Sequence, residues 1–288
     1  MNDLFENLNN GVIRDAILTG SMVAALCAVL SCFVILKGWS LMGDAISHAV
    51  LPGIVLAYIA GWPLALGAFL SGLACSAATG FIRQNSRIKE DTVLGVVFTG
   101  LFAFGLVLHS RTESELHLDH ILFGHLLGIP SDIALQVYVV GALVMLLLLL
   151  KRRDFLLICF DPGHARVLAM PAGLLTYLLL ALMVMAIVVS LQAVGIILVI
   201  AMLITPGCTA HLWTDRFDRM LAIATVSAVV STFAGIVVSV QLDADTAACI
   251  VLAQASAFVV SFLFAPKHGW LASKRRAARN SAFPSAAS

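Results

Sequence analysis

The most constraining feature of the sequence is a set of long segments without any Lys, Arg, Asp or Glu. Three of these segments are 16–36, 220–242 and 246–266. A helix of about 20 apolar residues crosses the roughly 30 Å hydrocarbon core of a bilayer. A transmembrane barrel would instead show strands of about ten residues in which apolar and polar residues alternate. The sequence therefore predicts an all-α fold, a polytopic bundle of transmembrane helices.

Composition supports the same class and excludes several others. Hydrophobic residues make up 61% of the 288 residues and charged residues 11%, whereas soluble proteins carry about 25% charged residues. The net charge of +1 gives no general attraction to nucleic acid, so no nucleic-acid partner is expected. The first ten residues are polar and acidic, unlike the basic start of a cleaved signal peptide. The six cysteines lie in or beside apolar runs without a CxxC motif, which favours buried thiols.

Charges, Gly-Pro turns and polar clusters divide the chain into nine expected spans. A single transmembrane domain is expected over 1–288, because no polar connection is long enough for a soluble domain. The uncharged run 167–210 exceeds one helix, and we place its division near 190–192. Eight spans remain possible if 132–150 or the span before it does not cross fully. The expected spans are 15–36, 41–60, 64–82, 92–109, 132–150, 172–190, 193–212, 220–240 and 246–265.

Basic residues set the expected orientation, because cytoplasmic loops carry an excess of Lys and Arg. With the N-terminus outside, only Arg14 and Arg111 of the 17 basic residues face outward, and the other 15 face the cytoplasm. The segment 267–288 is then a basic cytoplasmic tail. We expect an outside N-terminus and a cytoplasmic C-terminus.

The second span contains an unusual pair of ionisable residues, Asp44 and His48. Residues four apart share one helix face, and ionisable groups inside a membrane normally face the bundle interior or a water-filled path. A carboxylate and an imidazole together suit Mn, Fe or Zn. A proton relay and a structural hydrogen-bonded pair are the alternatives. Pro52 lacks a backbone donor, so we expect a helix break near this site.

The segment GDAISHAVLPG (43–53) resembles the permease family of bacterial ABC importers for manganese, zinc and iron, most closely its manganese and chelated-iron branch. The resemblance continues in RIKEDTVLGVVFTGLFAFGLVL (87–108), DHILFGHLLGI (119–129), CFDPGHARVLAMP (159–171) and VGIILVIAMLITPGCTA (194–210).

The resemblance implies a metal role and a set of partners. It assigns Asp44 and His48 as the pair that contacts the metal. It also implies a second permease subunit, two cytoplasmic ATP-binding subunits and an extracytoplasmic metal-binding protein. The chain departs from the family at Gly207 and Cys208, next to a helix break expected at Pro206, where small alanines are common.

A separate ATPase is expected because the sequence contains no P-loop. The segment 161–168 predicts a short helix that Asp161 caps and Pro162 begins. The resemblance places the coupling region here, with Asp161, His164 and Arg166 as contacts to the ATPase. An ordinary polar loop is the alternative.

Two outer loops carry further polar residues. Segment 109–125 contains four histidines and three acidic residues, which suggests a surface that concentrates metal or contacts the binding protein. Asp243 and Asp245 suggest a second contact. Solvated loops of this composition are the alternative for both.

The sequence therefore predicts the permease subunit of an ATP-driven importer in the bacterial cytoplasmic membrane. The expected cargo is manganese or iron, with zinc as the alternative, and no permanently bound cofactor is expected. A secondary transporter that uses the pair as a proton relay is a less favoured alternative, and a membrane metalloenzyme lacks a third ligand.

Overall fold

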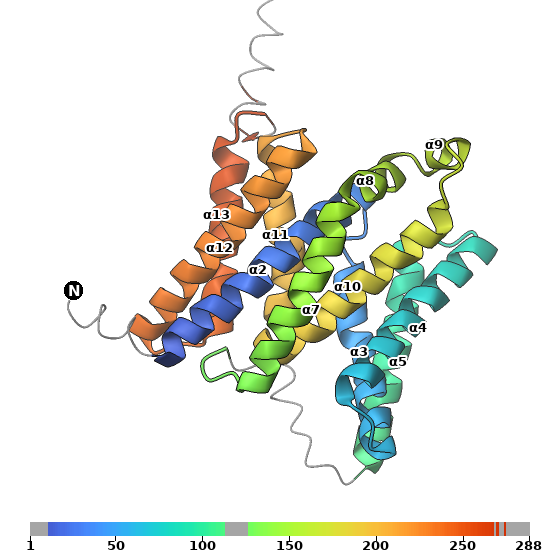
Figure 1. Cartoon of the computed structure of the whole chain (residues 1–288), viewed down its shortest axis with the longest axis horizontal. Helices are drawn as coiled ribbons and strands as arrows, with labels where there is room; N and C mark the ends of the chain where they lie inside the picture. Colours follow the sequence, from blue (N-terminus) through green and yellow to red (C-terminus); the bar gives the residue numbers. More distant parts are fainter. Residues whose placement is uncertain (1–10, 113–125, 268, 271–273, 275–288) are drawn as a thin grey trace, which may run out of the picture.

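The computed structural model describes residues 11–112, 126–267, 269, 270 and 274. In this part of the chain all regular structure is helical, and nine helices are long and apolar enough to cross a membrane. The all-α polytopic fold expected from the sequence is confirmed (Figure 1). The helices are α2 (Gly11–Lys37), α3 (Met42–Ala60), α4 (Leu64–Asn85), α5 (Glu90–Arg111), α7 (Ser131–Leu150), α8 (Arg152–Phe160), α9 (Pro162–Val167), α10 (Ala172–Val194), α11 (Ile196–Trp213), α12 (Phe217–Leu242) and α13 (Thr246–Phe264).

The nine expected spans match α2–α5, α7 and α10–α13, and one predicted boundary was wrong. We expected the chain to divide near 190–192, but Ser190 is fully buried within α10. The helix ends at Val194, and the following Gly195 has a φ of 80°, which favours glycine because a side chain strains that backbone conformation. The division thus follows backbone geometry rather than the polar residues nearby.

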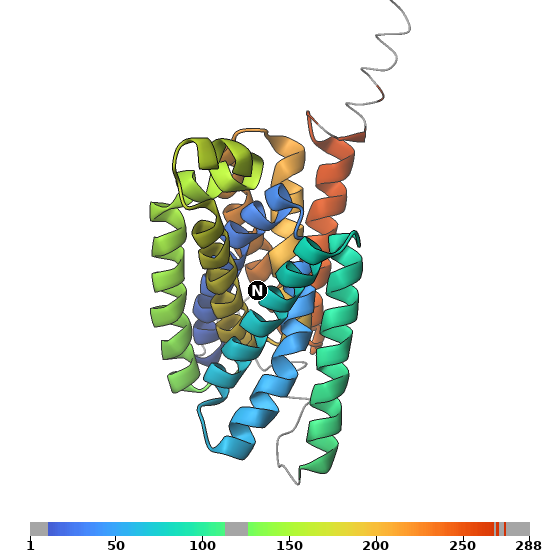
Figure 2. The same cartoon turned by 90° about the vertical axis from the view of Figure 1, so that its right-hand side faces the viewer.

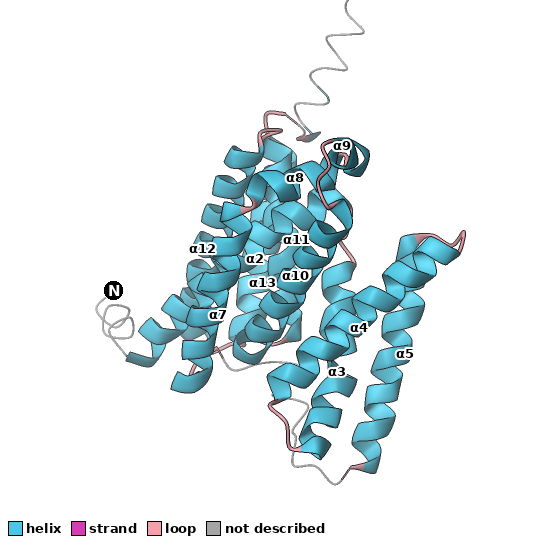
Figure 3. Cartoon of the chain, turned by 45° about the vertical axis from the view of Figure 1, so that its right-hand side comes forward, coloured by secondary structure: helices cyan, strands magenta, loops and turns pink. Residues whose placement is uncertain are grey.

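The helices form two packed groups that α10 joins. Helices α11, α12 and α13 pack on one another, α2 packs on α11 and α12, and α3 packs between α4 and α5. Helix α10 contacts α2, α3, α4 and α7, and Figure 3 shows α3, α4 and α5 as a separate group on one side. The start of α2 and the end of α13 lie at opposite ends of the bundle, as an odd number of spans requires (Figures 1 and 2).

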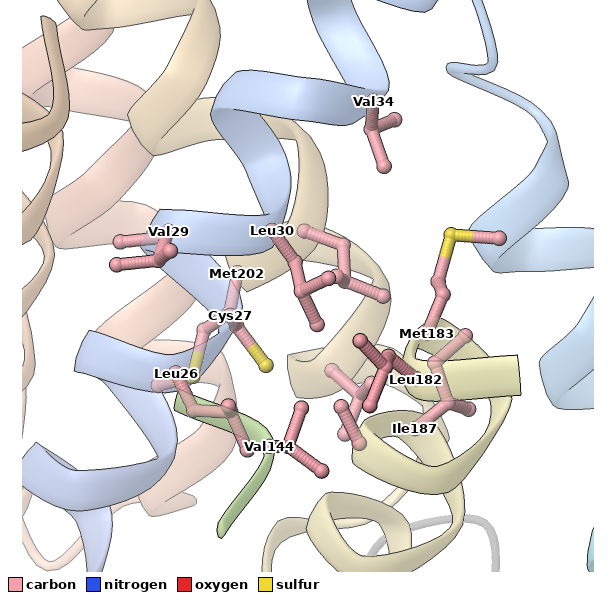
Figure 4. Packing of buried hydrophobic residues seen from close by; sticks show 14 of the residues in the cluster. Leu26, Cys27, Val29, Leu30, Val34, Val144, Leu182, Met183, Ile187 and Met202 are labelled. Atoms are coloured by element: carbon pink, nitrogen blue, oxygen red, sulfur yellow. The ribbon is translucent and has the colours of Figure 1, made fainter. Parts of the chain in front are cut away.

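The core lies where α2 meets α7, α10 and α11. Leu26 and Leu30 of α2, Met183 and Ile187 of α10, and Met202 of α11 are all buried (Figure 4). Because lipid is as apolar as these side chains, close van der Waals packing rather than water exclusion holds such helices together.

Neither expected helix break is present, because α3 continues through Pro52 and α11 through Pro206. Pro52 has no N–H to donate to the His48 carbonyl, and Ser side chains on neighbouring helices can hydrogen-bond backbone groups near such a proline. In α3, the Ser71 hydroxyl of α4 donates to the Ala49 carbonyl at 2.6 Å. The expectation of a break was wrong, and a hydrogen bond from α4 supports the backbone of α3 just before the proline.

Ser31 of α2 has the equivalent role beside Pro206. Its hydroxyl donates to the Ile204 carbonyl at 3.2 Å and accepts the Gly207 N–H at 2.9 Å. A Cβ at Gly207 would lie 2.7 Å from the Ser31 carbonyl oxygen. Glycine at position 207 therefore allows the backbones of α2 and α11 to approach closely.

The short helix α8 was not expected from the sequence. It buries Phe155, Ile158 and Cys159, and Phe33 of α2 packs edge-on against Phe155 with ring centroids 6.0 Å apart. The Lys37 Nζ donates to the Ile158 carbonyl at 2.8 Å, where a cation stabilises the carbonyl end of a helix. Helix α8 thus fixes one end of the bundle.

All six cysteines are free thiols, as the sequence suggested. Outside the spans, burial raises the pKa of Cys159 to about 11, although nearby Lys37 partly opposes this effect. A thiol with a raised pKa is mostly protonated at neutral pH and therefore unreactive.

Candidate functional site

Helix α3 places Asp44 and His48 on one face, as their spacing predicts. The His48 Nε2 lies 3.4 Å from the Asp44 Oδ1, and the side chains are 28% and 33% exposed, respectively. The separation is longer than a good hydrogen bond of 2.7–3.2 Å. The two side chains therefore face each other with little direct bonding, and each remains partly accessible.

Two phenylalanines of α5 surround the His48 ring. Phe98 stacks on the imidazole with ring centroids 6.0 Å apart, and Phe102 meets it edge-on at 5.2 Å. The His48 Nδ1 is buried and has no hydrogen-bond partner within the described residues. The rings restrict imidazole rotation, so Nε2 stays directed towards Asp44.

The separation of the two donor atoms suits a shared divalent cation. A tetrahedral ion with N and O ligands at about 2.1 Å holds them roughly 3.4 Å apart, and an octahedral ion holds them slightly closer. Within the described part of the chain, no group of three or more His, Cys, Asp or Glu side chains could hold a metal. Asp44 and His48 alone can therefore supply two ligands of an incomplete coordination shell.

Three glycines fix the half of α3 that follows the pair. Carbonyls and side chains of the neighbouring helices occupy the space that a Cβ at Gly53 or Gly67 would need. On α5, a Cβ at Gly105 would lie 2.8 Å from the Pro52 nitrogen. Helix α3 is thus held closely between α4 and α5 next to the pair.

The predicted capping of α9 is also present. The Asp161 Oδ1 accepts the His164 N–H at 2.8 Å, and the helix runs from Pro162 to Val167. The His164 side chain is exposed, whereas the side chains of Pro162 and Arg166 lie outside the described part of the structure.

Several residues near these sites were missed by sequence reasoning. Val167 and Leu168, at the end of α9, are 81% and 55% exposed and present apolar surface that the polar contacts did not suggest. Phe98 and Phe102 fall within the family-like segment 87–108, which was the available signal for them. No sequence motif indicated Ser31, whose hydroxyl bonds to the backbone of α11 beside Pro206.

The predicted contacts of the two outer loops with metal or with the binding protein stay predictions. Residues 113–125, which include His117, His120 and most of the proposed metal-concentrating surface, lie outside the described residues. Asp243 ends α12 with a φ of 49°, and Asp245 caps α13 by accepting the Ala248 N–H at 2.7 Å. Both aspartates thus have local structural roles in the turn.

The nine apolar helices in the described part of the chain define a multi-pass membrane protein. Residues 9–265 match the ABC 3 transport family, and the chain belongs to that family. The family membership predicted from the sequence motifs is confirmed.

Individual relatives cover nearly the whole chain. The chelated iron transport system membrane protein YfeD of Yersinia pestis is 54% identical over 252 residues, covering 88% of this chain and 85% of that protein. The manganese transport system membrane protein MntB of Synechocystis is 46% identical over 273 residues, covering 95% and 89%. The solved structure of PsaBC from Streptococcus pneumoniae in complex with Fab superposes with a TM-score of 0.86 at 34% identity, covering 95% of this chain and 99% of that one.

Proposed function

We propose that the chain is the membrane permease subunit of an ATP-driven importer for manganese or ferrous iron. The Asp44–His48 pair carries the proposal, because its donor atoms are spaced for one cation and its side chains are partly exposed. The relatives named for iron and manganese transport support the cargo. Zinc is the alternative, because carboxylate and imidazole ligands do not distinguish these metals.

A second permease subunit completes the proposed site. Two ligands hold an ion weakly, and a second copy or a paralogue related by a two-fold axis supplies two more. Incomplete and transient coordination favours transport, because an ion that is bound too tightly is not released.

The proposed orientation places α8 and α9 at the cytoplasmic face of the bacterial inner membrane. The chain links around Lys37, Arg83, Lys151 and Arg216 lie at the end that carries α8 and α9, as expected for a cytoplasmic face. The N-terminus is then outside and the tail 267–288 inside. The single permease domain receives metal at the opposite end from an extracytoplasmic binding protein.

Helix α9 is the proposed docking element for one of the two cytoplasmic ATP-binding subunits, and the second permease would dock the other. Its cap fixes its direction, and exposed Val167 and Leu168 offer apolar contacts beside exposed His164. ATP binding and hydrolysis on the partner would then move the permease helices without nucleotide chemistry in this chain.

Metal competition tests this function directly. Cells that express the complete system should accumulate labelled manganese, and the accumulation should stop when the ATPase subunit cannot hydrolyse ATP. Stronger inhibition by zinc than by iron or manganese would assign the system to zinc instead. Uptake that persists without ATP hydrolysis would favour a secondary transporter.

Replacing Asp161 with alanine should weaken attachment of the ATPase. The change removes the cap of a six-residue helix, and loss of an N-cap costs about 0.5–2 kcal/mol. We expect several-fold lower uptake and less ATPase recovered with the purified permease. The control is Asp245→Ala, which removes a similar cap on α13. Equal loss of ATPase in both variants would contradict a docking role for α9.

A further inference from the structure

A basic hollow lies between α8 and the start of α12, at the end of the bundle that also carries α9. Its volume is about 490 Å³. Four arginines and one aspartate give it a formal charge of +3, and two apolar side chains complete it. The lining consists of Arg152, Arg153, Leu156, Arg216, Phe217, Asp218 and Arg219.

Most of this positive charge has no partner among the residues that the structure describes. Arg152 donates to the Asp218 carboxylate at 2.9 Å. Within the described part of the chain, Arg153, Arg216 and Arg219 form no ion pair, and all three side chains are exposed. Repulsion among these guanidinium groups favours binding of an anion, and arginine matches the oxygens of a phosphate group particularly well.

The neighbouring acidic side chains are engaged elsewhere. Asp154 pairs with Lys151 at 3.4 Å, and Asp215 pairs with Lys267. The hollow therefore keeps its positive charge although acidic residues are near it in the sequence.

Apolar helix surface continues from the hollow towards the middle of the bundle. Leu156 and Phe217 line the hollow itself. Leu150, at the end of α7, is 70% exposed, and Val226 and Val230 of α12 are also exposed. Helices α7 and α12 both pack on α2 (Figure 1), so α2 links the two helices that carry these exposed side chains.

We propose that this hollow binds the phosphate headgroup of an anionic phospholipid, with the acyl chains along α7 and α12. The arginines supply positive charge for the phosphate group. The exposed apolar faces supply contacts for the acyl chains, which a soluble phosphate lacks. Basic pockets between transmembrane helices suit anionic headgroups in this way. The lipid would hold the amphipathic helix α8 against the start of α12.

Lipid-dependent thermal stability tests the proposal in the purified full-length protein. Phosphatidylglycerol, phosphatidylcholine or inorganic phosphate is added to the protein in neutral detergent at fixed ionic strength. Phosphatidylglycerol should raise Tm, and the other two should not. The double variant Arg153→Gln/Arg219→Gln should bind phosphatidylglycerol about 30-fold more weakly, because each cation at the surface contributes to lipid attraction.

The control variant Arg87→Gln/Lys89→Gln removes two exposed cations from the connection between α4 and α5. It should retain the full response to phosphatidylglycerol. Equal loss of the phosphatidylglycerol response in both variants would mean that binding depends on general electrostatic attraction rather than on the hollow. That result would overturn the proposal. An equal response to inorganic phosphate would indicate a soluble-anion site. An unchanged lipid response together with loss of co-purified ATPase would assign the surface to the ATPase.

If the double variant does not fold, Arg219→Gln alone should weaken lipid binding about fivefold, and an unchanged response would overturn the proposal.

Discussion

Replacing His48 with alanine is expected to reduce metal uptake to background while the permease stays in the membrane at its normal level. The change removes one of the two ligands that this chain supplies, which is two of four if the second permease is a copy of this chain and one of four if it is a paralogue. Loss of a residue that only orients a ligand commonly lowers metal affinity about 10–100-fold, so loss of the ligand itself should cost at least as much. Uptake of labelled manganese per assembled permease measures the effect.

Asp44→Asn provides a second test at the same site. Asparagine keeps the size of the side chain but removes its negative charge, which attracts a hard divalent cation. We expect uptake to fall nearly as far as in His48→Ala.

Ser47→Ala is the matched control within the same turns of α3. Among the described residues, the buried Ser47 hydroxyl bonds only to the Gly43 carbonyl of its own helix, at 2.8 Å. Its removal should leave uptake close to that of the wild type. Normal uptake in His48→Ala would make the Asp44–His48 pair a structural contact, even though the chain belongs to a transport family.

The spans could be predicted because burial in lipid imposes a simple rule on the sequence. A helix that crosses a bilayer must satisfy its backbone internally and carry few charges, so the nine spans were visible as apolar segments. Helix α8 was missed because its nine residues include three charged side chains at the start and bury only one face. Helix α10 ends before Gly195, where the backbone has a positive φ angle, and the polarity of the surrounding residues does not indicate this angle.

The site was predictable only where its geometry lies within one helix. Asp44 and His48 are four apart, and helix periodicity alone brings them together. The contacts of His48 with Phe98 and Phe102 depend on the rotation of α5 relative to α3. The hydrogen bond that the Ala49 carbonyl accepts near Pro52 likewise comes from Ser71 of another helix. Such contacts between helices are not encoded in a local spacing.

Replacing Gly67 with leucine should prevent α3 and α4 from packing and reduce the folded permease in the membrane to background. The glycines of the two helices contact each other reciprocally, because a Cβ at Gly53 would overlap the Gly67 carbonyl oxygen and the reverse also holds. A Cβ at Gly67 would also lie 2.5 Å from the Ala57 Cβ. A leucine side chain has no space in this contact unless the helices separate.

Gly67→Ala should have a graded effect in the same direction. Overpacking a close contact typically costs about 1–3 kcal/mol, which corresponds to a fall in Tm of roughly 2–10 °C for a chain of this size. Thermal unfolding of the purified protein in detergent measures the change. The control is Gly80→Ala on the same helix, where a Cβ would meet nothing within 4 Å. There alanine should be neutral or stabilising by up to about 1 kcal/mol. Equal Tm values for the two variants would contradict the close packing.

The α3–α4 contact should also matter for transport, because α3 carries the Asp44–His48 pair. Gly53→Ala would move α3 beside Pro52, and a Cβ there would lie 2.6 Å from Ser71. Gly235→Ala is equally crowded but affects α12 and α13, where a Cβ would lie 2.5 Å from the Ile250 Cα. Both variants should lower Tm. Only Gly53→Ala should reduce uptake per folded permease, because only that change displaces the helix on which the metal ligands lie. Equal uptake per folded molecule in the two variants would show that the α3–α4 contact has no specific effect on transport.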